Sequence, residues 1–141
     1  MRAIIAYAAA VAVAYLLGSA VSTLMVMAAI ATMGIPVQVA DIAYAVITDW
    51  GGLLASYLPL IALALLVALP VAGQLHSRLA LQRSGTYLLA GFIALVALHL
   101  IMEATLGLVG FAAARSPSGL ALQGLAGLFG AWVFTRVFPS R

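Results

Sequence analysis

The chain has no cysteine and no lysine, and only 6% of its 141 residues are charged. The absence of cysteine excludes disulfides, iron–sulfur clusters and thiolate metal sites. With 67% hydrophobic residues and a mean hydropathy of +1.26, the chain has too few polar groups to cover the surface of a soluble domain. The composition therefore predicts an integral membrane protein, and the lipid bilayer is its expected partner.

The basic residues are few and scattered. The net charge of +3 comes from six arginines against three acidic residues. Isolated arginines in a membrane protein orient the chain and do not form a nucleic-acid-binding surface, so we expect no nucleic-acid partner. A lysine-free composition rich in Ala, Leu, Gly and Val is typical of a GC-rich bacterial genome, which favours a bacterial inner-membrane protein.

Four apolar runs predict an all-α membrane protein that forms a single domain over residues 1–141. Each run is long enough to cross a hydrocarbon core of about 30 Å, which needs about 20 helical residues. The expected architecture is a bundle of four transmembrane helices. The predicted spans are about 3–33, 53–72, 86–110 and 119–135.

The first run begins like a signal peptide, with Arg2, an apolar core and a possible cleavage site at Gly18-Ser19-Ala20. The apolar run continues well past Ala20, which favours a membrane helix. As a helix it is roughly 46 Å long, so we expect it to tilt, to protrude or to bend near Gly18-Ser19.

The stretch of about 36–50 differs from the four runs, because it is too short to span and has polar residues on one side. Pro36 suits a first helical turn, and Gly51-Gly52 suits a stop. The stretch predicts a short amphipathic helix at the membrane interface between the first two spans, with Trp50 at headgroup level. Its polar side chains are Gln38, Asp41, Thr48 and Asp49.

The arginines predict an orientation. Placing the N-terminus inside leaves a single arginine, Arg115, outside, and the reverse orientation puts the other five outside. By the positive-inside rule, both termini are expected in the cytoplasm, with residues 34–52 and 111–118 outside. The five arginines expected inside are Arg2, Arg78, Arg83, Arg136 and Arg141.

His99 and Glu103 are the main candidates for a functional site. They lie one helical turn apart near the middle of the predicted span 86–110, where an ionisable group costs roughly 2.5–3.5 kcal/mol or more and usually marks a site. Small residues at the ends of their i, i+4 row allow another backbone to approach, so the pair is expected to face protein. The row is Gly91, Leu95, His99, Glu103 and Gly107.

Partners for this pair are expected on the other spans. Arg115 is too far, because twelve residues of helix cover about 18 Å. Hydroxyl and amide groups on the first and fourth spans lie at a similar depth and predict one hydrogen-bonded cluster, which is either a ligand or proton site or a structural clasp. These residues are Ser19, Ser22, Thr23 and Gln123. Gly124, Gly127 and Gly130 on the fourth span predict close helix packing.

Cofactors and catalysis have little support in the sequence. One His and one Glu are too few ligands for zinc or iron, and no catalytic motif is present, so no catalytic residue is predicted. Met25 and Met27 are candidate haem ligands opposite His99, but methionine usually fills gaps in a core. We therefore predict no cofactor and keep haem or quinone as a minor alternative.

Three functions remain open. The first is a non-enzymatic accessory or interaction subunit, in a homo-oligomer or a larger membrane complex. The second is a proton- or solute-responsive binding or transport protein that uses the His99/Glu103 pair. The third is a membrane anchor associated with quinone or haem. An intramembrane enzyme is disfavoured.

Overall fold

The computed structural model describes residues 1–106 and 116–138, and in these ranges the chain forms five helices and no strand. Four of the helices are long and apolar enough to cross a membrane, namely all except α2. The prediction of an all-helical chain with four such helices is confirmed. The helices are α1 (Arg2–Thr32), α2 (Val39–Gly52), α3 (Tyr57–Leu79), α4 (Arg83–Leu106) and α5 (Pro117–Val137).

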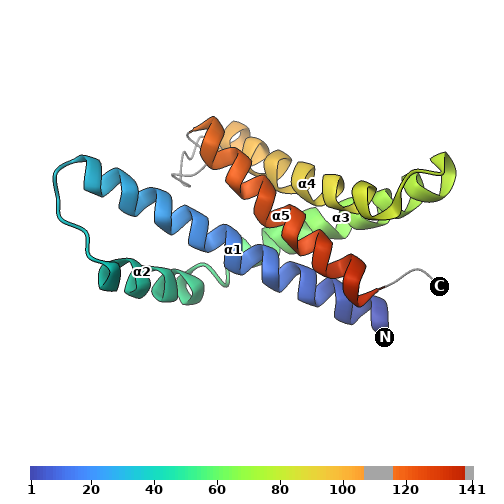
Figure 1. The fold of residues 1–141 in the computed structure, drawn as a ribbon, viewed down its shortest axis with the longest axis horizontal. Helices are drawn as coiled ribbons and strands as arrows, with labels where there is room; N and C mark the ends of the chain where they lie inside the picture. The colour runs from blue at the N-terminus through green and yellow to red at the C-terminus, as the bar shows by residue number, and fades with distance from the viewer. Residues whose placement is uncertain (107–115, 139–141) are drawn as a thin grey trace.

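The four long helices run up and down in chain order, and α5 crosses between α1 and α4 (Figure 1). Helix α5 packs against both α1 and α4, whereas α3 packs against α4 and, over a shorter stretch, against α1. The core therefore lies where α1, α3, α4 and α5 meet.

Glycines set how closely the helices approach. Gly91 on α4 and Gly127 on α5 lie backbone to backbone, and a β-carbon on either would clash with the carbonyl oxygen of the other. A β-carbon on Gly130 would lie 2.7 Å from the carbonyl oxygen of Ala10 on α1. A β-carbon on Gly124 would lie 2.5 Å from the ring of Phe92. Gly107 belongs to the range 107–115, outside the described residues.

Helix α3 continues beyond the predicted end of its span at residue 72 and reaches Leu79. The polar residues after Gly73 end the apolar run, but they do not end the helix, because polar side chains are compatible with helical backbone outside a hydrocarbon layer. The helix ends at Ala80, which adopts a left-handed conformation with φ of 48°.

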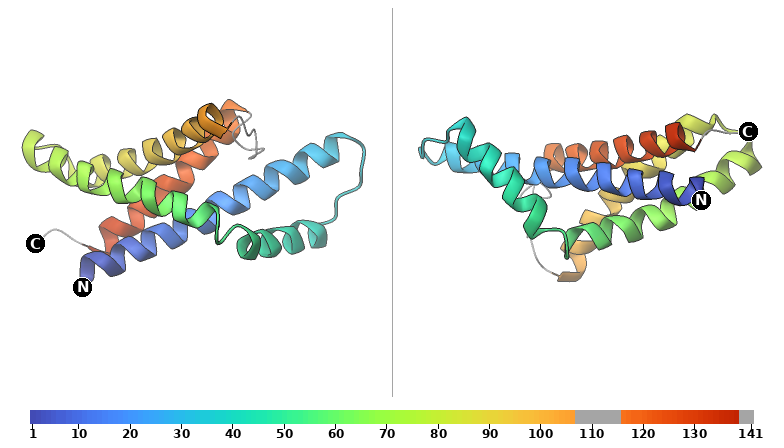
Figure 2. Two further views of the ribbon diagram at one scale, coloured as in Figure 1. Left: turned by 180° about the vertical axis from the view of Figure 1, so that it is seen from behind. Right: turned by 90° about the horizontal axis from the view of Figure 1, so that it is seen from below.

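Helix α1 is continuous through Gly18-Ser19, and its last turns extend together with α2 beyond the ends of α4 and α5 (Figures 1 and 2). Helix α2 begins at Val39, so Pro36 precedes it; the Gln38 backbone N–H donates to Asp41 Oδ2 at 2.9 Å at its start. Helix α2 runs back alongside α1 (Figure 2). Its location at a membrane interface stays a prediction.

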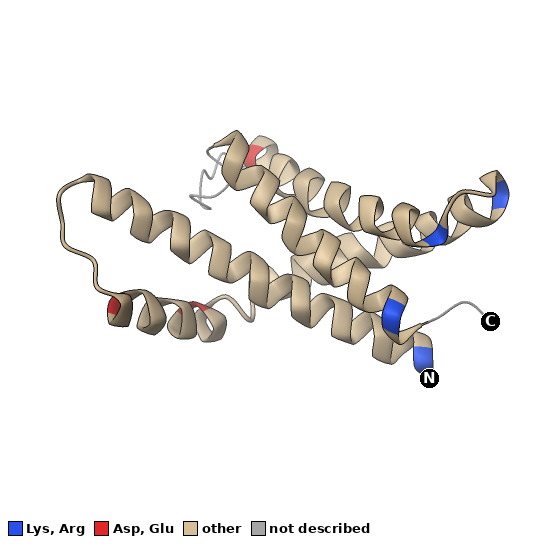
Figure 3. Ribbon diagram, viewed as in Figure 1, with Lys and Arg blue, Asp and Glu red and all other residues tan. Residues whose placement is uncertain are grey.

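The charged residues separate by sign along the bundle (Figure 3). The described arginines lie at the end that holds the N-terminus, and the acidic residues lie toward the opposite end. We refer to these as the arginine end and the acidic end. Arg115 and Arg141 lie outside the described residues. The arginines are Arg2, Arg78, Arg83 and Arg136, and the acids are Asp41, Asp49 and Glu103.

Candidate functional site

Five of the six polar side chains predicted on α1, α4 and α5, all except Glu103, are buried in the core of the bundle. His99 is 1% exposed and Gln123 is fully buried, although ionisable and amide groups are normally expensive to place in an apolar core. We call this group, together with Tyr57 of α3, the polar cluster. Its predicted members are Ser19, Ser22, Thr23, His99 and Gln123.

Gln123 is the centre of the polar cluster. Its Nε2 donates to the carbonyl oxygen of Gly18 at 2.9 Å and to Ser22 Oγ at 3.1 Å, both on α1. Its Oε1 accepts from the Tyr57 hydroxyl at 3.0 Å. A β-carbon on Gly18 would lie 2.9 Å from both Gln123 Oε1 and the Tyr57 hydroxyl, so this position has no room for a side chain. One amide thus connects three helices.

His99 is held by its own helix and by α3. Its Nδ1 lies 2.7 Å from the carbonyl oxygen of Leu95, an acceptor, so Nδ1 carries a proton. Its Nε2 lies 3.3 Å from the Tyr57 hydroxyl, and the two rings meet edge to face at 5.8 Å. With His99 neutral, Nε2 and Gln123 Oε1 are both acceptors for the single phenolic proton of Tyr57. The shorter distance favours Gln123.

Sequence reasoning missed Tyr57, which is fully buried. A tyrosine four residues into a predicted span attracts no attention by itself, because tyrosine is common near the ends of membrane helices. The available signal is helical spacing, because Tyr57 begins the row that α3 buries at three- and four-residue intervals. The rest of this row is Ile61, Leu65, Leu69 and Ala72.

Thr23 extends the polar cluster toward α2. Its hydroxyl lies 2.6 Å from Asp49 Oδ2 and 3.0 Å from the carbonyl oxygen of Ser19. The carboxylate is the stronger acceptor for the single hydroxyl proton. Asp49 was expected on the polar side of its helix, and in the structure this half-buried carboxylate contacts α1. The Ser19 hydroxyl is buried and has no hydrogen-bond partner in the described part of the chain.

A second contact between α1 and α2 uses Trp50 and lies about two turns nearer the start of α1 than Thr23. The indole Nε1 donates to the carbonyl oxygen of Leu16 at 3.1 Å, and the Tyr15 hydroxyl donates to the carbonyl oxygen of Trp50 at 2.5 Å. The C-terminal end of α2 is therefore fixed to α1 by three side-chain hydrogen bonds, whereas no residue of α2 is buried.

Glu103 does not join the polar cluster. It is exposed, and His99 directs its ring nitrogens to Leu95 and Tyr57. Glu103 also lies twenty residues after Arg83, about 30 Å along the helix axis, which is the full thickness of a hydrocarbon core. His99 lies about 24 Å from Arg83 on the same scale. Glu103 thus lies at the acidic end of α4, on its outer surface.

The described residues include no group of three His, Asp or Glu side chains that could hold a metal ion. Both ring nitrogens of His99 face protein groups inside the bundle, and the ring is 1% exposed. In this arrangement His99 presents neither nitrogen to a haem iron. In this arrangement the polar cluster connects α1, α3, α4 and α5 through hydrogen bonds among its side chains and to the α1 backbone.

Comparison with protein-family models, with curated proteins and with solved structures found no match.

Proposed function

We propose that the chain is a non-enzymatic accessory or interaction subunit of a membrane assembly. The observation that carries this proposal is the closed state of the polar cluster. Tyr57 and Gln123 are fully buried, and their polar groups bond to each other, to His99, and to backbone and hydroxyl groups of α1. Such a cluster fixes the arrangement of four helices, and it leaves the outer surface as the part available for contacts.

The outer surface supports contact with another protein. Glu103 is an exposed carboxylate in the last turn of α4, and a partner with a hydrogen-bond donor or a positive charge would pair with it there. Beyond the ends of α4 and α5, α2 exposes Tyr44 at 75% and Ile47 at 65%. These two features give the acidic end a surface that a partner helix or a second copy would cover.

The proposed location is a bacterial inner membrane with both termini in the cytoplasm. The concentration of described arginines at one end supports this orientation through the positive-inside rule (Figure 3). The acidic end, with α2 at an interface, would then face outward. A homo-oligomer or a larger complex is part of the same proposal.

Native mass spectrometry of the full chain, extracted with a mild detergent, tests this function. We expect a species heavier than the 14.5 kDa monomer. Glu103→Gln should reduce that species several-fold, whereas Asp41→Asn, which removes a carboxylate from α2, should leave it unchanged. A lone monomer, or an equal loss in the two variants, would contradict the proposal.

A second candidate, a proton-responsive binding protein, is favoured by one observation. The ionisable His99 is buried in the polar cluster, and its Nε2 lies 3.3 Å from the Tyr57 hydroxyl, which itself lies 3.0 Å from Gln123 Oε1. This candidate expects a tryptophan-fluorescence transition on acidification that His99→Gln abolishes and His76→Gln preserves. The absence of such a transition in the wild-type protein would exclude it.

A further inference from the structure

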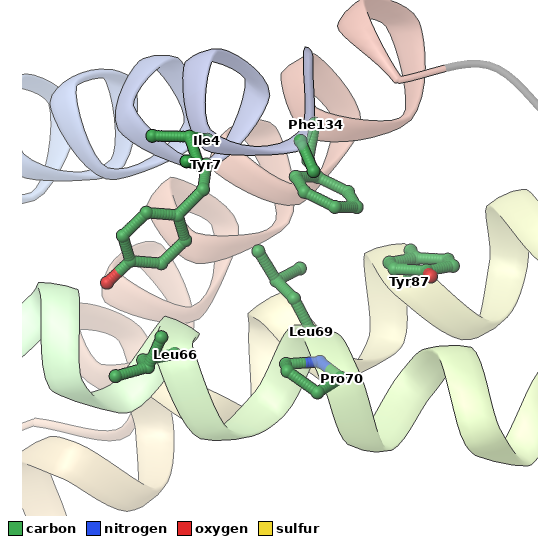
Figure 4. A pocket seen from close by; sticks show the side chains of 8 residues that line it. Ile4, Tyr7, Leu66, Leu69, Pro70, Tyr87 and Phe134 are labelled. Carbon is green, nitrogen blue, oxygen red and sulfur yellow. The ribbon is translucent and has the colours of Figure 1, made fainter. Parts of the chain in front are cut away.

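A second feature, independent of the polar cluster and of the function proposed above, lies at the arginine end. A cavity of about 310 Å³ lies between α1, α3, α4 and α5 (Figure 4). This volume falls at the lower limit of ordinary ligand pockets. Its side chains are aliphatic or aromatic: Ala3, Ile4, Tyr7, Leu66, Leu69, Pro70, Tyr87 and Phe134.

The hydroxyl groups of the two tyrosines in the wall point toward other groups of the protein and not into the cavity. The Tyr7 hydroxyl donates to the carbonyl oxygen of Ala62 at 2.6 Å. The Tyr87 hydroxyl points toward Gly73, where a β-carbon would lie 2.9 Å from it. The rings of Tyr7 and Tyr87 therefore form part of the apolar wall of the cavity (Figure 4). An occupant would be held by apolar contact, which fits a hydrocarbon chain.

The entrance lies on the outside of the bundle. Ile4 on α1 is 71% exposed and Leu66 on α3 is 55% exposed, and both belong to helices with the length and apolarity of membrane spans. In a bilayer this opening meets acyl chains, because the hydrocarbon region contains almost no water. The source of an occupant is therefore the surrounding lipid.

Positive charge lies against one residue of the cavity wall, Tyr87. The Arg83 guanidinium lies 5.3 Å from the centre of the Tyr87 ring and donates one hydrogen bond to the carbonyl oxygen of Phe138. A guanidinium has five N–H donors, so most of them stay available for an anion. Arg2 directly precedes Ala3 of the wall, and the described acidic residues lie toward the opposite end of the bundle (Figure 3).

We propose that this cavity is a binding site for an anionic glycerophospholipid. One acyl chain enters between Ile4 and Leu66 and packs against Tyr7, Tyr87 and Phe134. The phosphate lies at the arginine end and pairs with Arg83 and Arg2. An apolar cavity with arginines at its edge is the combination by which membrane proteins select anionic lipids from the bulk bilayer.

Native mass spectrometry of the full chain tests the site with defined lipids. The probes are phosphatidylglycerol and phosphatidylcholine with identical acyl chains, and a neutral quinone with a prenyl tail. We expect phosphatidylglycerol to bind at least tenfold more tightly than phosphatidylcholine. Arg83→Gln should remove most of this tenfold preference, because hydrogen bonds to charged groups are worth about one order of magnitude or more in affinity. Arg136→Gln, which loses the same charge next to Trp132 and outside this cavity, should keep the preference.

The role of the cavity is tested by filling it. Leu66→Trp and Ala3→Phe place rings in the opening from exposed positions, and both should lower phosphatidylglycerol binding at least tenfold. Circular dichroism and thermal unfolding identify any variant that fails to fold. If one filling variant fails to fold, the binding result of the other tests the site. Equal binding of the two phospholipids would overturn the assignment to an anionic lipid. Unchanged phosphatidylglycerol binding in the folded filling variants would show that the lipid binds elsewhere. Tighter binding of the quinone than of phosphatidylglycerol would contradict the proposal that the occupant is a phospholipid.

Discussion

The Tyr57 hydroxyl donates a hydrogen bond to Gln123 Oε1 at 3.0 Å, although the two residues are 66 positions apart in the chain. This bond connects α3 to α5, two helices that otherwise meet mainly through α1 and α4. It also orients the Gln123 amide, since its oxygen faces Tyr57 and its nitrogen faces the backbone and Ser22 of α1. The polar cluster therefore gives the bundle a defined register.

Gln123→Leu should destabilise the bundle. The change removes three hydrogen bonds and leaves the Gly18 carbonyl oxygen without its amide partner. Interhelical hydrogen bonds in membranes average about 0.6 kcal/mol each, so we expect a loss of about 2 kcal/mol. Reversible unfolding in mixed micelles measures it. Leu122→Ala, at a 41% exposed position on the same helix, serves as the control, and an equal loss there would contradict the role of the amide.

His99 should be neutral with its proton on Nδ1, because Nδ1 lies 2.7 Å from the Leu95 carbonyl oxygen. Solid-state ¹⁵N spectra of histidine-labelled protein in bilayers distinguish the two tautomers. His99→Gln assigns the signal by removing it. Tyr57→Phe should shift the Nε2 resonance and leave Nδ1 protonated. A proton found on Nε2 alone would contradict the observed geometry.

Gly127→Ala should separate α4 from α5. The new methyl group would clash with the Gly91 carbonyl oxygen and lie 3.1 Å from Leu95 Cδ1. Overpacking of this kind costs about 1–3 kcal/mol of unfolding free energy. We expect a loss near the upper value, because the new methyl group would meet backbone atoms, which cannot move aside as a side chain can. Thermal unfolding is the measurement. Gly51→Ala provides the comparison, because nothing lies within 4 Å of its β-carbon position and alanine favours the helix by up to about 1 kcal/mol.

Thr23→Val should loosen α2. The substitution keeps the shape of the side chain and removes the donor to Asp49 Oδ2 at 2.6 Å. Because no residue of α2 is buried, its attachment depends on few contacts, and its amide protons should exchange several-fold faster. Hydrogen exchange in nanodiscs measures this. Thr48→Val removes a hydroxyl that bonds only within α2, to the Tyr44 carbonyl oxygen, and should have little effect on the attachment.

The sequence predicted the cluster members on α1, α4 and α5 by their depth, but it placed Glu103 on the wrong side of α4. Each step of four residues in an α-helix rotates the side chain by about 40°, so three steps from Gly91 to Glu103 rotate it by about 120°. Gly91, Leu95 and His99 stay on the buried side, and Glu103 is exposed. An i, i+4 row of this length winds around the helix and does not follow one packing surface.

The sequence by itself determined the all-helical class and the four long apolar helices, because the amount and periodicity of apolar residues are properties of single segments. Only the tertiary structure decided which side chains meet. Tyr57 joins His99 and Gln123 because α3 crosses the bundle at that level. The cavity lined by Ile4 and Leu66 lies at the arginine end, where α1 and α3 diverge (Figure 2). Both outcomes depend on how whole helices rotate and cross. Packing between segments that are distant in the sequence determines that rotation and crossing.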